Sequence, residues 1–187
     1  MRGKDSARPT PAPVNIAPIK KISNKILIGP DCSFRSIPEK VSGVLEFFIN
    51  EKTKSQPAAK GAPQALKKLQ AFAQIIILSN VPHSVHNDRV ANLKDLNMDY
   101  PLISNEGMNG PAVKEILKNH KAQSFFIDDN PYQVESVYKD NQQTVCVHFS
   151  VCDLVKPYMP KAVGASIEPT SWEDLVSQLI GRLKDAE

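Results

Sequence analysis

The feature that most constrains the fold is a regular alternation of short apolar runs and amphipathic segments across residues 63–149. The apolar runs have the length of buried strands, and the segments between them repeat with the period of a helix. The expected elements are helix 63–72, strand 74–79, helix 84–96, a short strand at 102–103, helix 111–120, strand 124–128, helix 131–139 and strand 144–149. This alternation is typical of β-α-β units. Because right-handed crossovers place helices on both faces, we predict an α/β fold with a doubly wound, three-layer parallel sheet.

The sequence before this region predicts a tail, one more strand and one more helix. Residues 1–20 are rich in proline and offer few apolar side chains, so we expect a flexible N-terminal tail ahead of a single domain at 21–187. The apolar run 25–28 stops at Gly29 and Pro30 and reads as a buried strand. A helix is expected from about Pro38, and residues 52–63 look like a surface connection.

A final helix is expected from Ser171. Ser171 and Asp174 form the S-x-x-D pattern, in which the serine side chain caps the first turn. The apolar residues of this segment are candidates to pack the helix on the sheet, and they are Trp172, Leu175, Leu179 and Leu183.

Composition excludes several classes of protein. The net charge of +3 comes from basic and acidic residues spread along the chain. This distribution lacks the cluster of basic residues that is typical of nucleic-acid binding. The longest apolar runs are far shorter than the ~20 residues of a membrane helix, and the proline-rich start lacks the apolar stretch of a signal peptide. The 3 cysteines have no metal-ligand spacing and suit a reducing compartment. We therefore expect a cytoplasmic protein that binds neither nucleic acid nor membrane.

Polar side chains follow two of the predicted strands. Ser79 and Asn80 end the strand at 74–79, and Asp128 and Asp129 end the strand at 124–128. Because open parallel sheets bind ligands beyond the carboxyl ends of their strands, these two ends could face one ligand. Adjacent carboxylates repel one another unless a cation lies beside them, and Mg2+ is the natural candidate. The alternative is that Asp129 caps the following helix, which starts near Asn130.

The order of these segments resembles motifs II, III and IV of the haloacid dehalogenase-like (HAD) hydrolase superfamily. The similarity is closest to a group of bacterial HAD-like proteins, and it covers roughly residues 57–180. The familiar segments are Leu78-Ser79-Asn80-Val81-Pro82, Met98 to Leu102, Gly110-Pro111-Ala112-Val113, Phe126-Ile127-Asp128-Asp129 with Ser136-Val137, and His148-Phe149. The resemblance implies a Rossmann-like HAD core. Asp31 and Ser79 are only 48 positions apart, and Ser79 and Asn109 only 30, which leaves little room for a cap domain, so we expect none of sizeable length.

The resemblance also implies roles for individual residues. Ser79 matches the motif II hydroxyl that holds phosphoryl oxygens, with Asn80 beside it. Asp128 matches the motif IV ligand of magnesium, and Asp129 matches the second acidic residue that orients the waters of the ion. In HAD phosphatases an Asp at the end of the first strand attacks phosphorus, and a second Asp two residues later acts as acid and base.

This sequence departs from the superfamily at two positions. Aligning the first strands puts Gly29 at the nucleophile position and Asp31 at the acid/base position, and glycine cannot attack phosphorus. A shifted register makes Asp31 the nucleophile, but it places Gly29 and Pro30 in the last turn of the strand, where proline removes a ladder donor. In motif III Asn109 stands where the resembling group has a lysine. Lys114 could reach back to bind phosphate, or it could be an ordinary solvated helix lysine.

Two functions follow from these residues. The first is a HAD-like protein with a Mg2+/phosphate pocket and weak or no catalytic activity. The alternative is a Mg2+-dependent phosphatase, a phosphoric monoester hydrolase that works through an aspartyl-phosphate intermediate. A site without a cap domain would suit a bulky phosphorylated partner, or it could be covered by a second subunit. We expect the partner to be a small phosphorylated ligand or a phosphorylated macromolecule, and the oligomeric state stays open. The two functions differ in which residue occupies the nucleophile position at the end of the first strand.

Overall fold

A computed structural model describes residues 25–29, 47, 49–152, 154 and 156–185. The predicted tail at 1–20, the expected helix start at Pro38 and the candidate residue Asp31 lie outside the described residues. The boundary between a tail and a domain at 21–187 therefore stays a prediction.

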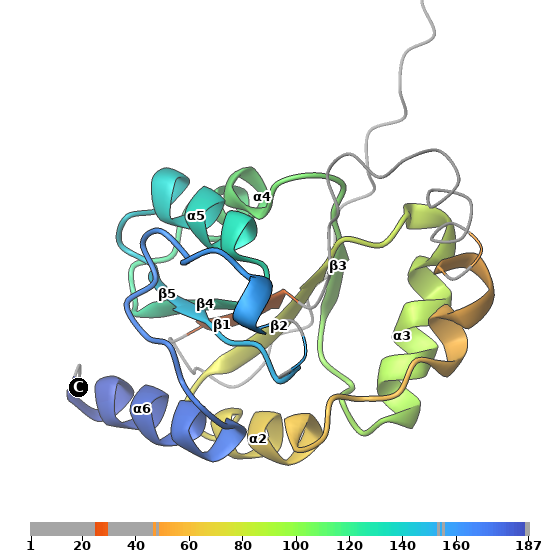
Figure 1. Cartoon of the computed structure of the whole chain (residues 1–187), viewed down its shortest axis with the longest axis horizontal. Coiled ribbons are helices and arrows are strands. Elements are labelled where there is room, and N and C mark those ends of the chain that lie inside the picture. Colours follow the sequence, from red (N-terminus) through yellow and green to blue (C-terminus); the bar gives the residue numbers. More distant parts are fainter. Residues whose placement is uncertain (1–24, 30–46, 48, 153, 155, 186–187) are drawn as a thin grey trace, which may run out of the picture.

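The described strands form one parallel sheet of five strands in the order β3-β2-β1-β4-β5 (Figure 1). The strands are β1 (Lys25–Gly29), β2 (Gln74–Ser79), β3 (Leu102–Ser104), β4 (Ser124–Asp128) and β5 (Val145–His148). Every pairing between neighbours is parallel. The chain first moves outward from β1 through β2 to β3 and then crosses back to β4 and β5. This reversal makes the sheet doubly wound, with its switch point between β1 and β4.

Helices cover both faces of this sheet. The described α-helices are α2 (Ala62–Leu69), α3 (His86–Asp95), α4 (Asn109–Ile116), α5 (Pro131–Asp140) and α6 (Trp172–Asp185). Short 3-10 helices occur at η1 (Thr53–Ser55), η2 (His83–Val85) and η3 (Lys156–Tyr158). Helices α4 and α5 pack side by side on one face, and α2 and α6 do so on the other (Figure 1). The predicted three-layer α/β architecture is confirmed.

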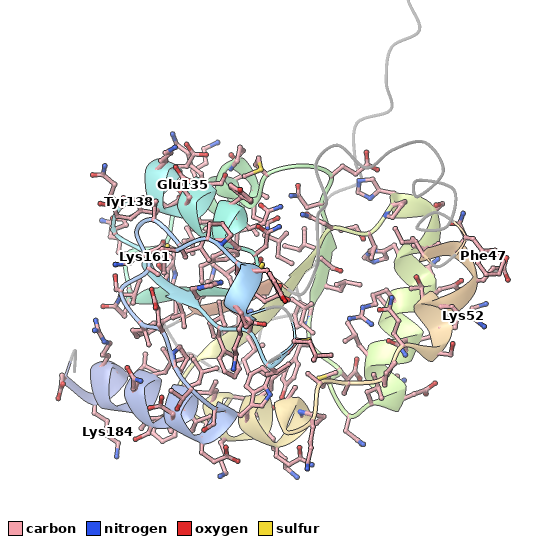
Figure 2. All side chains as sticks on the ribbon, viewed as in Figure 1. Phe47, Lys52, Glu135, Tyr138, Lys161 and Lys184 are labelled. Carbon is pink, nitrogen blue, oxygen red and sulfur yellow. The ribbon has the colours of Figure 1, made fainter. Side chains whose placement is uncertain are left out.

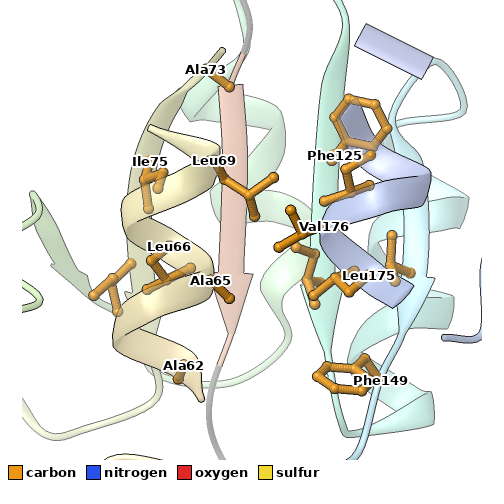
Figure 3. Close-up of a cluster of buried hydrophobic side chains, with 14 of the residues drawn as sticks. Ala62, Ala65, Leu66, Leu69, Ala73, Ile75, Phe125, Phe149, Leu175 and Val176 are labelled. Atoms are coloured by element: carbon orange, nitrogen blue, oxygen red, sulfur yellow. The ribbon is translucent and has the colours of Figure 1, made fainter. Parts of the chain in front are cut away.

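The strands bury alternate residues against the two helical layers. Ile75, Ile77, Phe125 and Ile127 face α2 and α6 in the larger core cluster, whose side chains Figure 3 shows between these helices and the sheet. Leu27, Ile76, Leu78, Phe126 and Cys146 belong to the second cluster, with α4 and α5. Because side chains alternate along a strand, this division also fixes the face toward which each polar residue at a strand end points.

The cap of α6 forms as its sequence pattern predicts. The backbone N–H of Asp174 donates to Ser171 Oγ at 3.1 Å, and Asp174 Oδ2 accepts from the backbone N–H of Thr170 at 2.9 Å. Leu175, Leu179 and Leu183 are buried, and Trp172 packs against the same cluster. The final helix is therefore held both by its first turn and by its apolar face.

Two local predictions need correction. The segment 52–63 is more than a surface connection, because it contains η1 with a fully buried Thr53. Helix α4 begins at Asn109 rather than at 111, since Pro111 fits inside a first turn that needs no N–H donor there. That shift moves Asn109 from a loop to the first turn of a helix.

No helix in the described part of the chain is long and apolar enough to cross a membrane. Charged side chains such as Lys52, Glu135 and Lys184 project from the surface (Figure 2).

Candidate functional site

The candidate site lies at the switch point, where the carboxyl ends of β1 and β4 meet. Gly29 is the register partner of Asp128, and these two residues end their strands together. Register partners in a parallel sheet point toward the same face. Since Leu27 and Phe126 face α4 and α5, Gly29 and Asp128 end their strands on that side of the sheet.

Two neutral groups donate hydrogen bonds to the Asp128 carboxylate. The side chain is almost fully buried. Its Oδ1 accepts from the backbone N–H of Asn130 at 2.7 Å, and its Oδ2 accepts from the side-chain amide of Asn109 at 3.3 Å. These two donors hold the carboxylate in place without adding a positive charge.

A chain of amide side chains joins Asp128 to the end of β2. Asn105 Nδ2 donates to Asn109 Oδ1 at 2.9 Å and to Asn80 Oδ1 at 3.1 Å. Together with the bond from Asn109 to Asp128, these contacts run across the carboxyl edge from β2 to β4. We call Asn80, Asn105, Asn109 and Asp128 the amide network. Sequence reasoning missed Asn105, although its position directly after a strand was a usable signal.

Gln133 of α5 fixes the turn that carries Asn109. Its Oε1 accepts from the backbone N–H of Asn109 at 2.7 Å, and its Nε2 donates to the carbonyl of Gly107 at 3.1 Å. Asn80 Nδ2 donates to the same carbonyl at 3.1 Å. Gly107 has a φ of 103°, which favours glycine. Gln133 is also absent from the sequence prediction, because nothing in a helical pattern reveals a partner 24 residues away.

Ser79 lies at the same edge as Asp128 but not beside it. Strands β2 and β4 flank β1 rather than pairing with each other. Ser79 is fully buried, and strand alternation places it on the face of Ile77, opposite the face of Asp128. One ligand can therefore meet both side chains only above the edge of the sheet.

Asp129 points away from Asp128. It lines a cavity together with Ile77 and Arg89 on the α2 and α3 side of the sheet. Burial raises the pKa of the Asp129 carboxyl, while its own backbone hydrogen bond and nearby His148 oppose that rise. The alternative reading, in which Asp129 caps the following helix, is wrong. Asn130 caps that helix, and its Oδ1 accepts from the backbone N–H of Tyr132 at 2.9 Å.

Lys114 is not brought to Asp128. It is exposed and lines a separate hollow with Lys118, Asp140 and Gln142. Asn109 contacts Asp128 from the first turn of α4, and Lys114 follows five residues later, ~7.5 Å further along the helix axis. The helix runs away from the carboxyl edge, so each turn takes its residues further from the site.

Solved structures with this arrangement of elements share one fold. The L-2-haloacid dehalogenase from Xanthobacter autotrophicus with chloropropionic acid covalently bound matches 79% of this chain and 69% of its own, with a TM-score of 0.54 and 17% identity. YfnB of Bacillus subtilis, a candidate HAD-hydrolase bound to magnesium, matches 86% of this chain and 100% of its own, with a TM-score of 0.53 and 13% identity. The chain has the haloacid dehalogenase-like fold.

The likeness of this HAD fold to known proteins lies in structure and not in sequence. The sequence matches no protein-family model and no curated protein. A haloacid dehalogenase-like protein from Burkholderia xenovorans LB400 matches 78% of this chain and 68% of its own at a TM-score of 0.54, but with 16% identity. The chain spans only 53% and 64% of the length of two other L-2-haloacid dehalogenases that it matches.

The residues at this HAD switch point fit a hydrated Mg2+ ion. Mg2+ prefers oxygen ligands, keeps several waters and needs only one or two carboxylates. Asp128 supplies one carboxylate at the edge. Within residues 25–29, 47, 49–152, 154 and 156–185, no group of three or more His, Cys, Asp or Glu side chains could hold a metal. Among the described residues, Asp128 is therefore the carboxylate that would hold such an ion, and water would supply most of the other ligands.

Proposed function

We propose that this protein binds Mg2+ and a phosphorylated ligand at the HAD switch point and turns over phosphate esters weakly or not at all. The proposal is carried by the register pair of Gly29 and Asp128. Neighbouring strands lie ~4.8 Å apart, so a carboxylate at position 29 would share a metal ion with Asp128. Glycine provides neither that second charge nor an atom that attacks phosphorus.

The amide network supports the same function. Phosphoryl transfer depends on positioned charges that stabilise the transition state. The donors that reach Asp128 from Asn109 and Asn130 are a side-chain amide and a backbone N–H. Such a site can orient a ligand through hydrogen bonds, but its described donors do little to offset developing negative charge.

A covalent step on a haloacid would meet the same obstacle. In the Xanthobacter autotrophicus dehalogenase, chloropropionic acid is bound covalently. Covalent capture requires an attacking side chain. Position 29, at the end of the central strand, offers none, so we favour binding over turnover for either class of substrate.

The test compares hydrolysis of p-nitrophenyl phosphate by the wild type and by Gly29→Asp in Mg2+. We expect near-background turnover from the wild type and a gain on the order of tenfold or more from Gly29→Asp. Gly181→Asp is the matched control, because a side chain at Gly181 on α6 meets open space. It adds the same carboxylate away from the site and should leave turnover at the background.

The alternative function makes the opposite prediction. If Asp31 is the nucleophile, the wild type hydrolyses the ester briskly, Asp31→Asn abolishes this activity and Gly29→Asp adds nothing. That result would establish a Mg2+-dependent phosphatase and end the binding-only proposal. Isothermal titration with Mg2+ gives a separate readout, in which Asp128→Asn should abolish a weak but measurable binding signal.

A further inference from the structure

A cavity of about 280 Å³ lies on the opposite face of the sheet from the amide network. Its described walls come from the segment 56–59, from α2, β2 and α3, and from Leu96, Met98, Asp129 and Trp172. None of Asn80, Asn105, Asn109 or Asp128 is among these lining residues. The cavity is therefore separate from the site proposed above.

Most of the cavity wall is hydrocarbon. Leu66, Ile77, Leu93 and Met98 are buried residues of the larger core cluster, and all four line the cavity. An apolar cavity of ~150 Å³ is already enough to hold a benzene ring in a protein core. The volume here accommodates a longer aliphatic chain.

One wall carries a positive charge in a fixed position. Arg89 Nη1 donates to Gln56 Oε1 at 2.9 Å and to Asn92 Oδ1 at 2.6 Å. Asn92 is buried and donates in turn to the carbonyls of Lys54 at 3.1 Å and Gln56 at 2.9 Å. This set of bonds ties the segment before α2 to α3. It also orients the guanidinium, and an oriented guanidinium is the side chain best suited to recognise a carboxylate.

We propose that this cavity binds a small aliphatic monocarboxylate, with its hydrocarbon chain against Leu66, Leu93 and Met98 and its carboxylate toward Arg89. Asp129 lines the same cavity and limits how much negative charge the ligand can carry. A monoanion satisfies that limit better than a phosphate dianion does. Ligand pockets commonly combine an apolar wall with a few placed polar groups in this way.

The test titrates the full-length protein with hexanoate, hexanol and inorganic phosphate in Mg2+-free buffer, followed by NMR chemical shifts. We expect saturable binding of hexanoate, at least tenfold weaker binding of hexanol and no phosphate binding at the cavity. Arg89→Gln should weaken hexanoate binding tenfold or more and leave hexanol binding unchanged. Ala58→Leu adds bulk to the cavity wall and should weaken both ligands.

Controls separate recognition from loss of structure. Lys118→Gln removes a positive charge from an exposed position on the other face and should leave hexanoate binding unchanged. If Arg89→Gln fails to fold, Arg89→Lys keeps the charge without the planar fork and should bind hexanoate with an intermediate affinity. Equal affinities for hexanoate and hexanol, an equal loss of both in Arg89→Gln, or preferential binding of phosphate would overturn the proposal. Absence of saturable hexanoate binding would do so as well.

Discussion

The side-chain amide of Asn109 donates to the Asp128 carboxylate across 3.3 Å, at the position where the resembling HAD proteins have a lysine. Asn109 is almost fully buried, and its backbone N–H is held by Gln133. Position 109 therefore lies against Asp128, but its side chain carries no charge. A neutral amide satisfies Asp128 by hydrogen bonding but cannot balance a phosphate dianion.

A positive charge at position 109 should strengthen anion binding. We expect Asn109→Lys to raise the affinity for inorganic phosphate in Mg2+ on the order of tenfold, since a hydrogen bond to a charged donor is stronger than one to an amide. Isothermal titration measures the effect. Asn119→Lys, at an exposed position, is the matched control and should have no effect. Equal affinities for wild type and Asn109→Lys would show that position 109 does not face the bound anion.

The contact between α4 and α5 should not tolerate a methyl group at Gly110. A Cβ there would lie 2.4 Å from Asp140 Oδ2 and 2.5 Å from the carbonyl of Ser136. We expect Gly110→Ala to cost ~1–3 kcal/mol of unfolding free energy through overpacking. Gly181→Ala meets open space on α6 and should instead gain ~0.5–1 kcal/mol, because alanine favours helix. Urea unfolding of both variants checks the opposite signs.

The buried amide of Asn92 should contribute substantially to stability. Asn92→Ala removes the donor for the carbonyls of Lys54 and Gln56 and leaves these groups short of a partner. We expect a loss of ~1–3 kcal/mol, the usual cost of an unsatisfied buried polar group. Asn87→Ala on the exposed face of α3 is the control and should stay within ~0.5 kcal/mol of the wild type. Similar unfolding midpoints for the two variants would contradict this role for Asn92.

The cap of α6 should make the free energy of unfolding depend on pH in the acidic range. The backbone N–H of Thr170, then the side chain of Gln178, lower the pKa of Asp174 below its usual 3.8. The stabilisation is therefore present above 3.8 and is lost as the pH falls through the lowered value. At neutral pH, Asp174→Asn should unfold at a lower urea concentration than the wild type. This difference in midpoint should shrink below pH 3.8. A difference that stays constant into acid would show that the charge of Asp174 does not stabilise the cap.

Local chemistry made several parts of this structure predictable. The apolar runs at 74–79 and 124–128 are short and almost entirely buried. Short apolar runs of this kind are typical of strands in a parallel sheet that is covered on both faces. The Ser171 to Asp174 cap formed because both partners lie within one turn of the chain. The end of the first strand at Gly29 likewise followed from the glycine and proline that interrupt the apolar run.

The sequence by itself thus determined the layers, the edge of the sheet that carries polar residues and the glycine at the end of the central strand. Tertiary structure alone decided which of those polar residues meet. Strand order separated Ser79 from Asp128, and the direction of α4 carried Lys114 away while bringing Asn109 in. The physical reason is that hydrophobic period and capping act within a few residues. The bonds from Asn105 to Asn80 and from Asn109 to Gln133 instead join residues 25 and 24 positions apart, and only the packed sheet brings them together.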